Sequence, residues 1–383
     1  MRTVSKTVIG VDFGTQSARA VLVNAENGEI IYSCRKEYPY NSTPVPAIDC
    51  AENLPCATDY EMTLYELLRN VIPEEYRKTV AGICIDATSL TMVLLAEDGR
   101  ALSELDGWSE AAHARVKLWK YHRAQEKADE ALNLASNLQE PFLGRTGGSI
   151  SCEWMLPKLL EVRDEAPEIY SKIDLAMDLC EFLTFRLTGQ LVRSIGSLSY
   201  KCLWAEDLSF PERTFLNGLR AGFYEEYCHF LRGDVRKPGE CAGMLRSELT
   251  KRWGLPEQIP VATGMLDGHT SLATMGAFEP GDAALIVGTS NVCTVQDRKL
   301  QELKDVCGVA QEGMVTGSCG IDTGQSSTGN MLGWFVEHMA GWQIHREAEE
   351  RKISPHQVLA ERIQKPWENK VIAVDWWSGS RNA

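Results

Sequence analysis

The sequence predicts an α/β protein built from two domains, and three observations lead to this expectation. The chain has 383 residues, which is enough for two sizeable cores. It opens with a strand–turn–strand pattern at 8–23, and a second pattern of the same kind follows at 283–296. Between them lies a long stretch whose apolar residues recur at helical spacing.

The first part of the chain reads as strands around one helix. Alternating apolar residues and short turns predict the strands. These expected strands span 8–13, 18–23, 29–38, 80–86 and 90–96, with a turn at 87–89 before the last. The expected helix has Thr58 or Asp59 as its N-cap and ends at Val71.

The middle of the chain is predicted to be mainly helical. Residues 109–138 have a helical pattern of mixed charge, and further helices are expected at 153–163 and 176–187. Pro157 falls in the opening turns of its helix, where proline is tolerated, and Gly189 ends the last helix. We interpret this part as an insertion that builds a binding pocket on the first domain.

Pro260 marks the expected domain boundary, with residues 1–258 in the first domain and 259–383 in the second. The second domain opens with a strand at 261–268 that ends in an acidic residue and a glycine. A hairpin follows, with strands at 283–287 and 291–296 around a turn at 288–290. The strand–turn–strand pattern at the start of the chain therefore occurs again in its second part.

Charge and composition exclude several classes of function. The formal net charge is −14, which argues against nucleic-acid binding and against an anionic membrane surface. No signal peptide and no apolar run of membrane-spanning length is visible. The 12 cysteines form no C-x-x-C pair and no cluster with histidines, so we expect reduced thiols in a cytoplasmic protein without a zinc site.

The turn after the first strand carries groups that suit a phosphate and a metal ion. Its backbone N–H groups can face a phosphate, and the hydroxyls of Thr15 and Ser17 add donors. Asp12, at the strand end, can hold Mg²⁺ directly or through water. Taken alone, the pattern is equally that of a hairpin turn with no ligand.

The second domain supplies two complementary elements. The turn Gly288, Thr289 and Ser290 can hold a phosphate from the opposite side, which would clamp the phosphates of a nucleotide across a cleft. Asp267 can accept the proton of a substrate hydroxyl. The alternative is that Asp267 forms a turn or caps a helix at 270–275.

Three segments together resemble the FGGY family of carbohydrate kinases. Residues 9–17 resemble the family's phosphate-1 motif, 264–269 the segment with its catalytic base, and 281–290 its phosphate-2 hairpin. Their order and spacing match, and the resemblance covers essentially the whole chain. Four further segments are similar to the ribulokinase branch, namely 116–122, 147–154, 199–204 and 320–326.

The resemblance implies a set of sugar contacts. Its members are Ala87, Thr88, Ser89, Lys201, Asp267 and Asp322. Gln325 adds an acceptor near a glycine turn, and Trp119 or Trp154 could form an apolar wall, although plain helix-core roles fit both tryptophans. Asp322 stands where the family has glutamate, and Cys202 where it has a small residue, which leaves the exact sugar open.

The resemblance also implies the fold, the cofactors and the activity. The fold is the actin-like ATPase (ribonuclease H-like) fold, with two domains hinged over a cleft that holds ATP. Mg²⁺ would be held by Asp12 and Asp267. The implied nucleotide contacts are Asp12, Gly14, Thr15, Gln16, Ser17, Arg19, Gly288, Thr289 and Ser290. The implied activity is phosphorylation of a ketopentose, ribulose first, on a terminal hydroxyl, with Asp267 as general base.

The end of the sequence leads to a further expectation. Residues 370–383 are similar to a stretch that lies well inside the second domain of ribulokinases, so we expect that domain to be incomplete and to lack its adenosine-binding part. We therefore expect this chain to bind sugar better than ATP and to have little or no kinase activity alone. An unpaired strand edge there would favour self-association, for instance as a homodimer. Three alternatives stay open: a sugar-binding remnant without catalysis, a kinase for xylulose or another ketose or polyol, and a sensor ATPase of the same fold.

Overall fold

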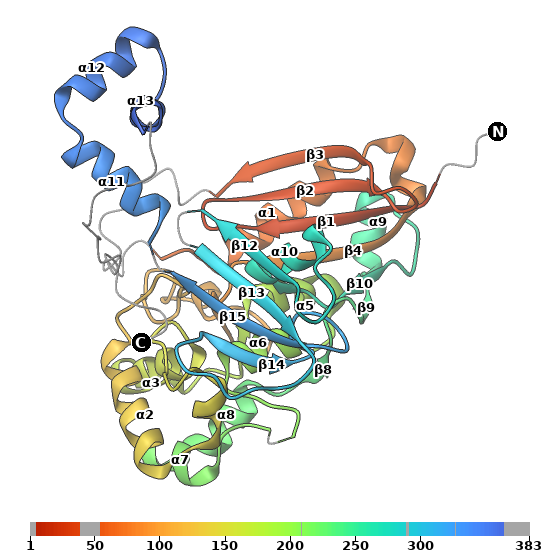
Figure 1. Cartoon of the computed structure of the whole chain (residues 1–383). Helices are drawn as coiled ribbons and strands as arrows, with labels where there is room; N and C mark the ends of the chain where they lie inside the picture. Colours follow the sequence, from red (N-terminus) through yellow and green to blue (C-terminus); the bar gives the residue numbers. More distant parts are fainter. Residues whose placement is uncertain (1–4, 39–53, 208, 289–290, 326, 364–383) are drawn as a thin grey trace.

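The computed structural model describes residues 5–38, 54–207, 209–288, 291–325 and 327–363 (Figure 1). In these residues a seven-stranded sheet has the order β3-β2-β1-β4-β10-β9, with β11 also paired to β4. Its strands are β1 (Thr7–Phe13), β2 (Ser17–Asn24), β3 (Ile30–Glu37), β4 (Val80–Ala87), β9 (Cys241–Met244), β10 (Pro260–Ala262) and β11 (Met265–Leu266). The antiparallel meander predicted for the first three strands is confirmed.

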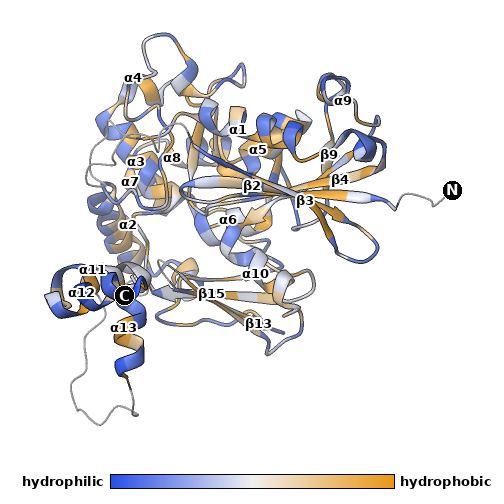
Figure 2. Ribbon diagram, turned by 90° about the horizontal axis from the view of Figure 1, so that it is seen from above, coloured by the Kyte–Doolittle hydropathy of each residue, from blue (hydrophilic) through white to orange (hydrophobic). Residues whose placement is uncertain are grey.

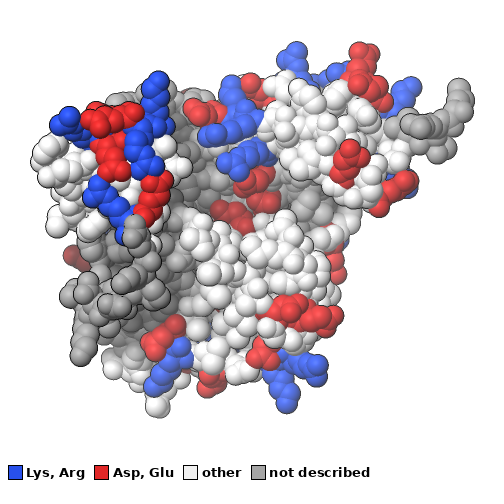
Figure 3. All heavy atoms as spheres, turned by 45° about the horizontal axis from the view of Figure 1, so that its top comes forward, with Lys and Arg blue, Asp and Glu red and all other residues white. Residues whose placement is uncertain are grey.

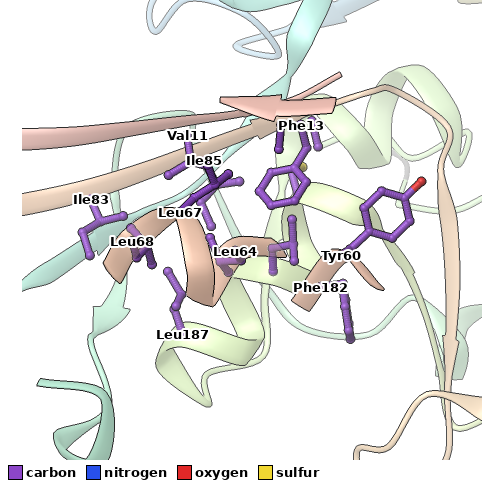
Figure 4. Close-up of a cluster of buried hydrophobic side chains, with 14 of the residues drawn as sticks. Val11, Phe13, Tyr60, Leu64, Leu67, Leu68, Ile83, Ile85, Phe182 and Leu187 are labelled. Atoms are coloured by element: carbon purple, nitrogen blue, oxygen red, sulfur yellow. The ribbon is translucent and has the colours of Figure 1, made fainter. Parts of the chain in front are cut away.

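The main core lies between this sheet and two helices, α1 (Ala57–Asn70) and α5 (Leu179–Thr188). Figure 4 shows Val11 and Phe13 of β1 above Leu64 and Leu67 of α1. The N-cap of α1 is Cys56, so the predicted caps Thr58 and Asp59 were wrong. Asp59 lies one turn further on, where its carboxylate accepts the Cys56 N–H at 3.3 Å, as in a capping box.

The second sheet is antiparallel throughout and, as far as it is described, has the order β12-β13-β15-β14. Its strands are β12 (Ala283–Val287), β13 (Asn291–Asp297), β14 (Gly308–Gln311) and β15 (Cys319–Gln325). The predicted hairpin of β12 and β13 is confirmed. Two helices, α6 (Ile195–Lys201) and α10 (Asp267–Met275), lie between the two sheets (Figure 2).

The remaining helices of the first part gather at one end of the molecule (Figure 1, lower left). They are α2 (Gln125–Leu138), α3 (Met155–Glu165), α4 (Pro167–Tyr170), α7 (Arg213–Leu219) and α8 (Phe223–Phe230), with α9 (Ser247–Trp253) on the far side. Short 3₁₀ helices span Glu74–Thr79, Leu102–Glu104 and Pro141–Arg145. The helical pattern predicted from residue 109 is therefore a helix only from Gln125 onward.

Two short sheets correct the prediction for the middle of the chain. β5 (Met92–Leu95) pairs with β6 (Leu175–Asp178) and not with β4, and β7 (Val192–Ser194) pairs with β8 (Asp234–Arg236). The helix predicted from residue 176 starts at Leu179, because Asp178 has an extended backbone and forms the N-cap. A short apolar run fits a buried strand and a helix equally well, which explains the error.

Strand pairing suggests a different position for the domain boundary. β10 and β11 follow residue 258, yet both pair in parallel with β4 of the first sheet. The chain leaves that sheet only after Leu266. We therefore propose that the boundary lies between Leu266 and β12, with α10 as the connection.

The last described helices project from the rest of the structure (Figure 1). They are α11 (Gly329–Met339), α12 (Trp342–Arg351) and α13 (Pro355–Arg362), of which α12 and α13 share a small core of their own. Arg351 pairs with Glu347 at 2.9 Å and Glu361 at 2.7 Å. Figure 3 shows Lys or Arg and Asp or Glu side chains gathered together at its upper left. No described helix is long and apolar enough to span a bilayer. The segment at 370–383 lies outside the described residues.

Tyr200 of α6 joins the helices to the second sheet. Its hydroxyl donates to the Gly320 carbonyl at 2.7 Å, and its ring lies against the glycines of that sheet. A Cβ at Gly308 or Gly313 would lie 2.8 Å or 2.6 Å from ring carbons of Tyr200. The ring therefore needs glycine at these positions, and Lys201, the next residue, is fixed in place by the same contact.

We expect Gly320→Ala to lower the free energy of unfolding by about 1–3 kcal/mol, as overpacking of a filled core does. A Cβ there would meet the Tyr200 hydroxyl and would lie 2.7 Å from Met314 Sδ. The matched control is Gly333→Ala in α11, where a Cβ would meet nothing within 4 Å. Urea unfolding of both variants tests this: equal stability of Gly320→Ala and wild type would contradict the packing described for Tyr200.

Candidate active site

A cavity of about 750 Å³ lies between the two sheets. It brings together most of the predicted site residues: Asp12, Gly14, Thr15, Arg19, Thr88, Ser89, Trp119, Trp154, Lys201, Asp267, Gly288 and Asp322. The described residues that were predicted but do not line it are Gln16, Ser17, Ala87 and Gln325. Thr289 and Ser290 lie outside the described residues.

The residues that miss the cavity have other local roles. Ser17 Oγ accepts the Arg35 Nε–H at 3.0 Å, on the sheet. Ala87 ends β4 and is fully buried in the main core. Gln325 Oε1 is within 3.5 Å of Asn291 Nδ2 and 3.4 Å of Thr328 Oγ1, at the end of β15. Gln16 is an exposed turn residue.

Three carboxylates lie at one edge of the first sheet. Asp12 is directly opposite Asp86 in the parallel pair β1–β4, and Met265 of β11 is opposite Asp86 on the other side. Asp267 follows β11 immediately, so all three side chains reach the same end of neighbouring parallel strands and face the cavity. Asp86 was not predicted, although its position at a strand end beside Asp12 is the signal that could have revealed it.

The environment gives Asp86 and Asp267 different pKa values. Burial, followed by the charge and a hydrogen bond of Asp12, raises the pKa of Asp86 to about 9, so Asp86 is protonated at neutral pH. Burial raises the pKa of Asp267 to about 6, and hydrogen bonds from the Gly268 and Ser89 backbone N–H groups limit that rise. Asp267 is therefore ionised at neutral pH, and protonated Asp86 donates to Asp12.

The carboxylates of this cluster are candidate ligands for a metal ion. No three His, Cys, Asp or Glu side chains within the described ranges are arranged as a ready site for a metal ion. The donor chemistry nevertheless fits Mg²⁺, which takes one or two carboxylates and completes its shell with water and phosphate oxygens. A cation here would also relieve the repulsion by Asp12 that contributes to the high pKa of Asp86.

A second charged group lies on the other side of the cavity. Asp322 of β15 lies 3.3 Å from Lys201 Nζ and 3.5 Å from His269 Nε2, and all three side chains are buried. Burial acts to raise the pKa of Asp322, but Lys201 and His269 outweigh it and hold that pKa well below its ordinary value. His269 stacks edge-on against Tyr200. Its role was not predicted, and its place two residues after Asp267 was the available signal.

Further hydrogen-bonding groups line the cavity besides the three carboxylates and the group around Asp322. Trp119 Nε1 donates to Thr15 Oγ1 at 3.2 Å, which connects the predicted apolar wall to the predicted phosphate turn. Ser89 Oγ is buried without a hydrogen-bond partner among the described residues. A buried hydroxyl of this kind is expected to bond a ligand.

Comparisons with known proteins agree with this geometry. The model of the N-terminal domain of the FGGY family of carbohydrate kinases matches residues 7–274. Ribulokinase of Halalkalibacterium halodurans is 32% identical over 99% of this chain and 69% of its own length. Ribulokinase of Mycolicibacterium smegmatis is 35% identical over 98% of this chain and 69% of its own length.

Solved structures of sugar kinases share the fold. Xylulose kinase of Lactobacillus acidophilus superposes with a TM-score of 0.76 at 18% identity and covers 98% of this chain and 69% of its own. Xylulose kinase of Rhodospirillum rubrum gives a TM-score of 0.74 at 19% identity, with 99% and 71% covered. The chain therefore belongs to the FGGY family of carbohydrate kinases and has that family's actin-like ATPase fold.

Proposed function

We propose that this carbohydrate kinase phosphorylates a pentulose, ribulose being the first candidate, on a terminal hydroxyl with ATP as the donor. The observation that carries the proposal is the position of Asp267, in one cavity with the Asp12–Thr15 turn and the Lys201–Asp322 pair. The names of the relatives, ribulokinases and xylulose kinases, favour a five-carbon ketose.

Asp267 acts as the general base in this proposal. A base with a pKa of about 6 is ionised at neutral pH and is still basic enough to accept a proton as the hydroxyl attacks. Asp267 is the first residue of α10, and the positive end of the helix dipole favours its charge. The Gly268 N–H donates to its Oδ1 at 2.7 Å, and the Ser89 N–H also donates to this carboxylate, so that the substrate hydroxyl would use a remaining lone pair.

The phosphates of the nucleotide are assigned to the turn after β1. Gly14 and Thr15 offer backbone N–H groups and a hydroxyl, Arg19 offers a guanidinium, and Gly288 lies across the cavity. Asp12 and Asp267 would hold Mg²⁺, and Asp86 would position Asp12 through their hydrogen bond. When bound, the ion would neutralise charge on the transferring phosphoryl group.

The sugar is assigned to the Lys201 side of the cavity. Lys201, Asp322 and His269 supply donors and acceptors that replace water around hydroxyl groups. Because the short Asp322 side chain already contacts Lys201 and His269, its reach toward a sugar is limited. Xylulose is therefore the alternative substrate, and the test below compares the two pentuloses, which differ in stereochemistry.

Substrate choice is tested with a coupled ADP assay on ribulose, xylulose, a ketohexose, glycerol and an aldohexose, with sugar binding measured separately by calorimetry. We expect pentuloses to bind well above glycerol, because Lys201, Asp322 and His269 can contact a longer hydroxyl chain, and any turnover of this chain to follow the same order. Activity confined to glycerol or to an aldohexose would remove the pentulose assignment.

The base is tested by Asp267→Asn, which should lower kcat by about 10²–10⁴-fold, the usual contribution of a general base. The affinity for sugar should stay within about tenfold, since the amide retains much of the hydrogen bonding. The control is Asp282→Asn, which removes an acid that accepts a turn N–H, from Glu279 at 2.9 Å, outside the cavity. Near wild-type kcat in Asp267→Asn would mean that Asp267 has the same structural role as Asp282.

A further inference from the structure

Leu90, in the turn that lines the cavity after β4, has an unusual backbone. Its φ is 63°, in the left-handed region that residues with a Cβ rarely adopt. Neither glycine nor asparagine, the residues that tolerate this region best, occupies the position. A strained residue at a functional site persists only where its surroundings hold it.

Two buried side chains, one basic and one acidic, hold this residue. The Leu90 N–H donates to Asp178 Oδ2 at 3.1 Å, and Lys158 Nζ donates to the Leu90 carbonyl at 2.7 Å. Lys158 is 0% exposed and Asp178 is 1% exposed. They come from different elements, since Lys158 lies on α3 and Asp178 is the N-cap of α5. Both polar groups of the strained residue are therefore fixed from opposite sides.

Lys158 has no acidic hydrogen-bond partner among the described residues. Its other two donors go to the carbonyls of Lys117, at 3.3 Å, and Leu118, at 2.9 Å, so backbone carbonyls take all three N–H groups. Leu118 precedes Trp119 of the cavity wall. Burying a lysine amino group that contacts only backbone carbonyls costs free energy. The contribution of Lys158 is therefore to hold these carbonyls in place.

The turn held in this way touches the proposed base. The backbone N–H of Ser89, next to Leu90, donates to Asp267. On the other side, the Thr88 N–H donates to the Phe13 carbonyl at 2.8 Å, beside the phosphate turn. A change in the Leu90 backbone would therefore move a donor away from Asp267.

We propose that Lys158 and Asp178 form a clamp that holds Leu90 in its left-handed conformation and so positions the Ser89 N–H on Asp267. Through Leu118 the same ammonium group fixes the Trp119 wall relative to the turn. Both are positioning residues, since neither lines the cavity. The consequence for sugar binding rests on the proposed function, whereas the order of the turn does not.

Lys117 provides a matched control. It is also 0% exposed, but its ammonium group pairs with Glu161 at 3.3 Å and Tyr121 Oη at 3.1 Å and does not contact the turn. Lys158→Met and Lys117→Met both remove a buried charge, and both should lower Tm. Only Lys158→Met should loosen the turn.

The test is hydrogen exchange of the backbone amides of residues 88–91, followed by calorimetric titration with ribulose and xylulose. In Lys158→Met we expect exchange of these amides to rise about tenfold or more, because local opening of the turn becomes easier. The affinity for the sugar that wild type binds should fall by a similar factor. In Lys117→Met both quantities should stay within about twofold of wild type, with the amides of β1 and β2 as the internal reference.

Unchanged exchange at 88–91 in folded Lys158→Met would overturn the clamp, and so would an equal rise in Lys117→Met. Faster exchange without any binding of a pentulose by wild type would support the clamp and contradict the proposed function. If Lys158→Met does not fold, Lys158→Gln, which keeps part of the donor set, is measured in the same way with Lys117→Gln as its control.

Discussion

Three carboxylates meet at the ends of neighbouring parallel strands of the first sheet, and their mutual repulsion determines the chemistry of the cavity. Asp12, Asp86 and Asp267 are there because β1, β4 and β11 are parallel neighbours. Ionising all of these neighbouring acids would cost free energy through charge repulsion. That cost is lower because Asp86 stays protonated and because Asp267 accepts hydrogen bonds from two backbone N–H groups. The result is an ionised Asp267 placed to accept a proton, beside Asp12, whose carboxylate suits a cation.

The opposite wall depends on how the second sheet packs. Glycines of β14 and β15 let the Tyr200 ring approach the sheet closely, and this contact places Lys201 beside Asp322. α10 begins with Asp267 and carries His269 to the same acid. One helix therefore connects the proposed base to the proposed sugar contacts, and the order of the cavity depends on packing between the sheets as much as on local turns.

Sequence reasoning succeeded where the signal was local. The hairpins around Gly14 and Gly288 follow from alternation and turn residues, and they place Asp12 at a strand end without knowledge of the fold. It failed where strand pairing is distant in sequence. Asp86 belongs to the site only because β4 lies between β1 and β11, and β10 belongs to the first sheet only through its pairing with β4. The clamp on Leu90 is invisible in sequence, since left-handed backbone is not expected of leucine.

The proposal that Asp267 is an ionised base, with a pKa below that of Asp86, is checked by kcat/KM for the pentulose between pH 5 and 9. Because the base acts when it is ionised, we expect kcat/KM to rise about tenfold per pH unit below about pH 6 and to reach a plateau above it. Circular dichroism over the same range ensures that the protein stays folded. A value of kcat/KM that is flat or falls as pH rises through 6 would contradict the account.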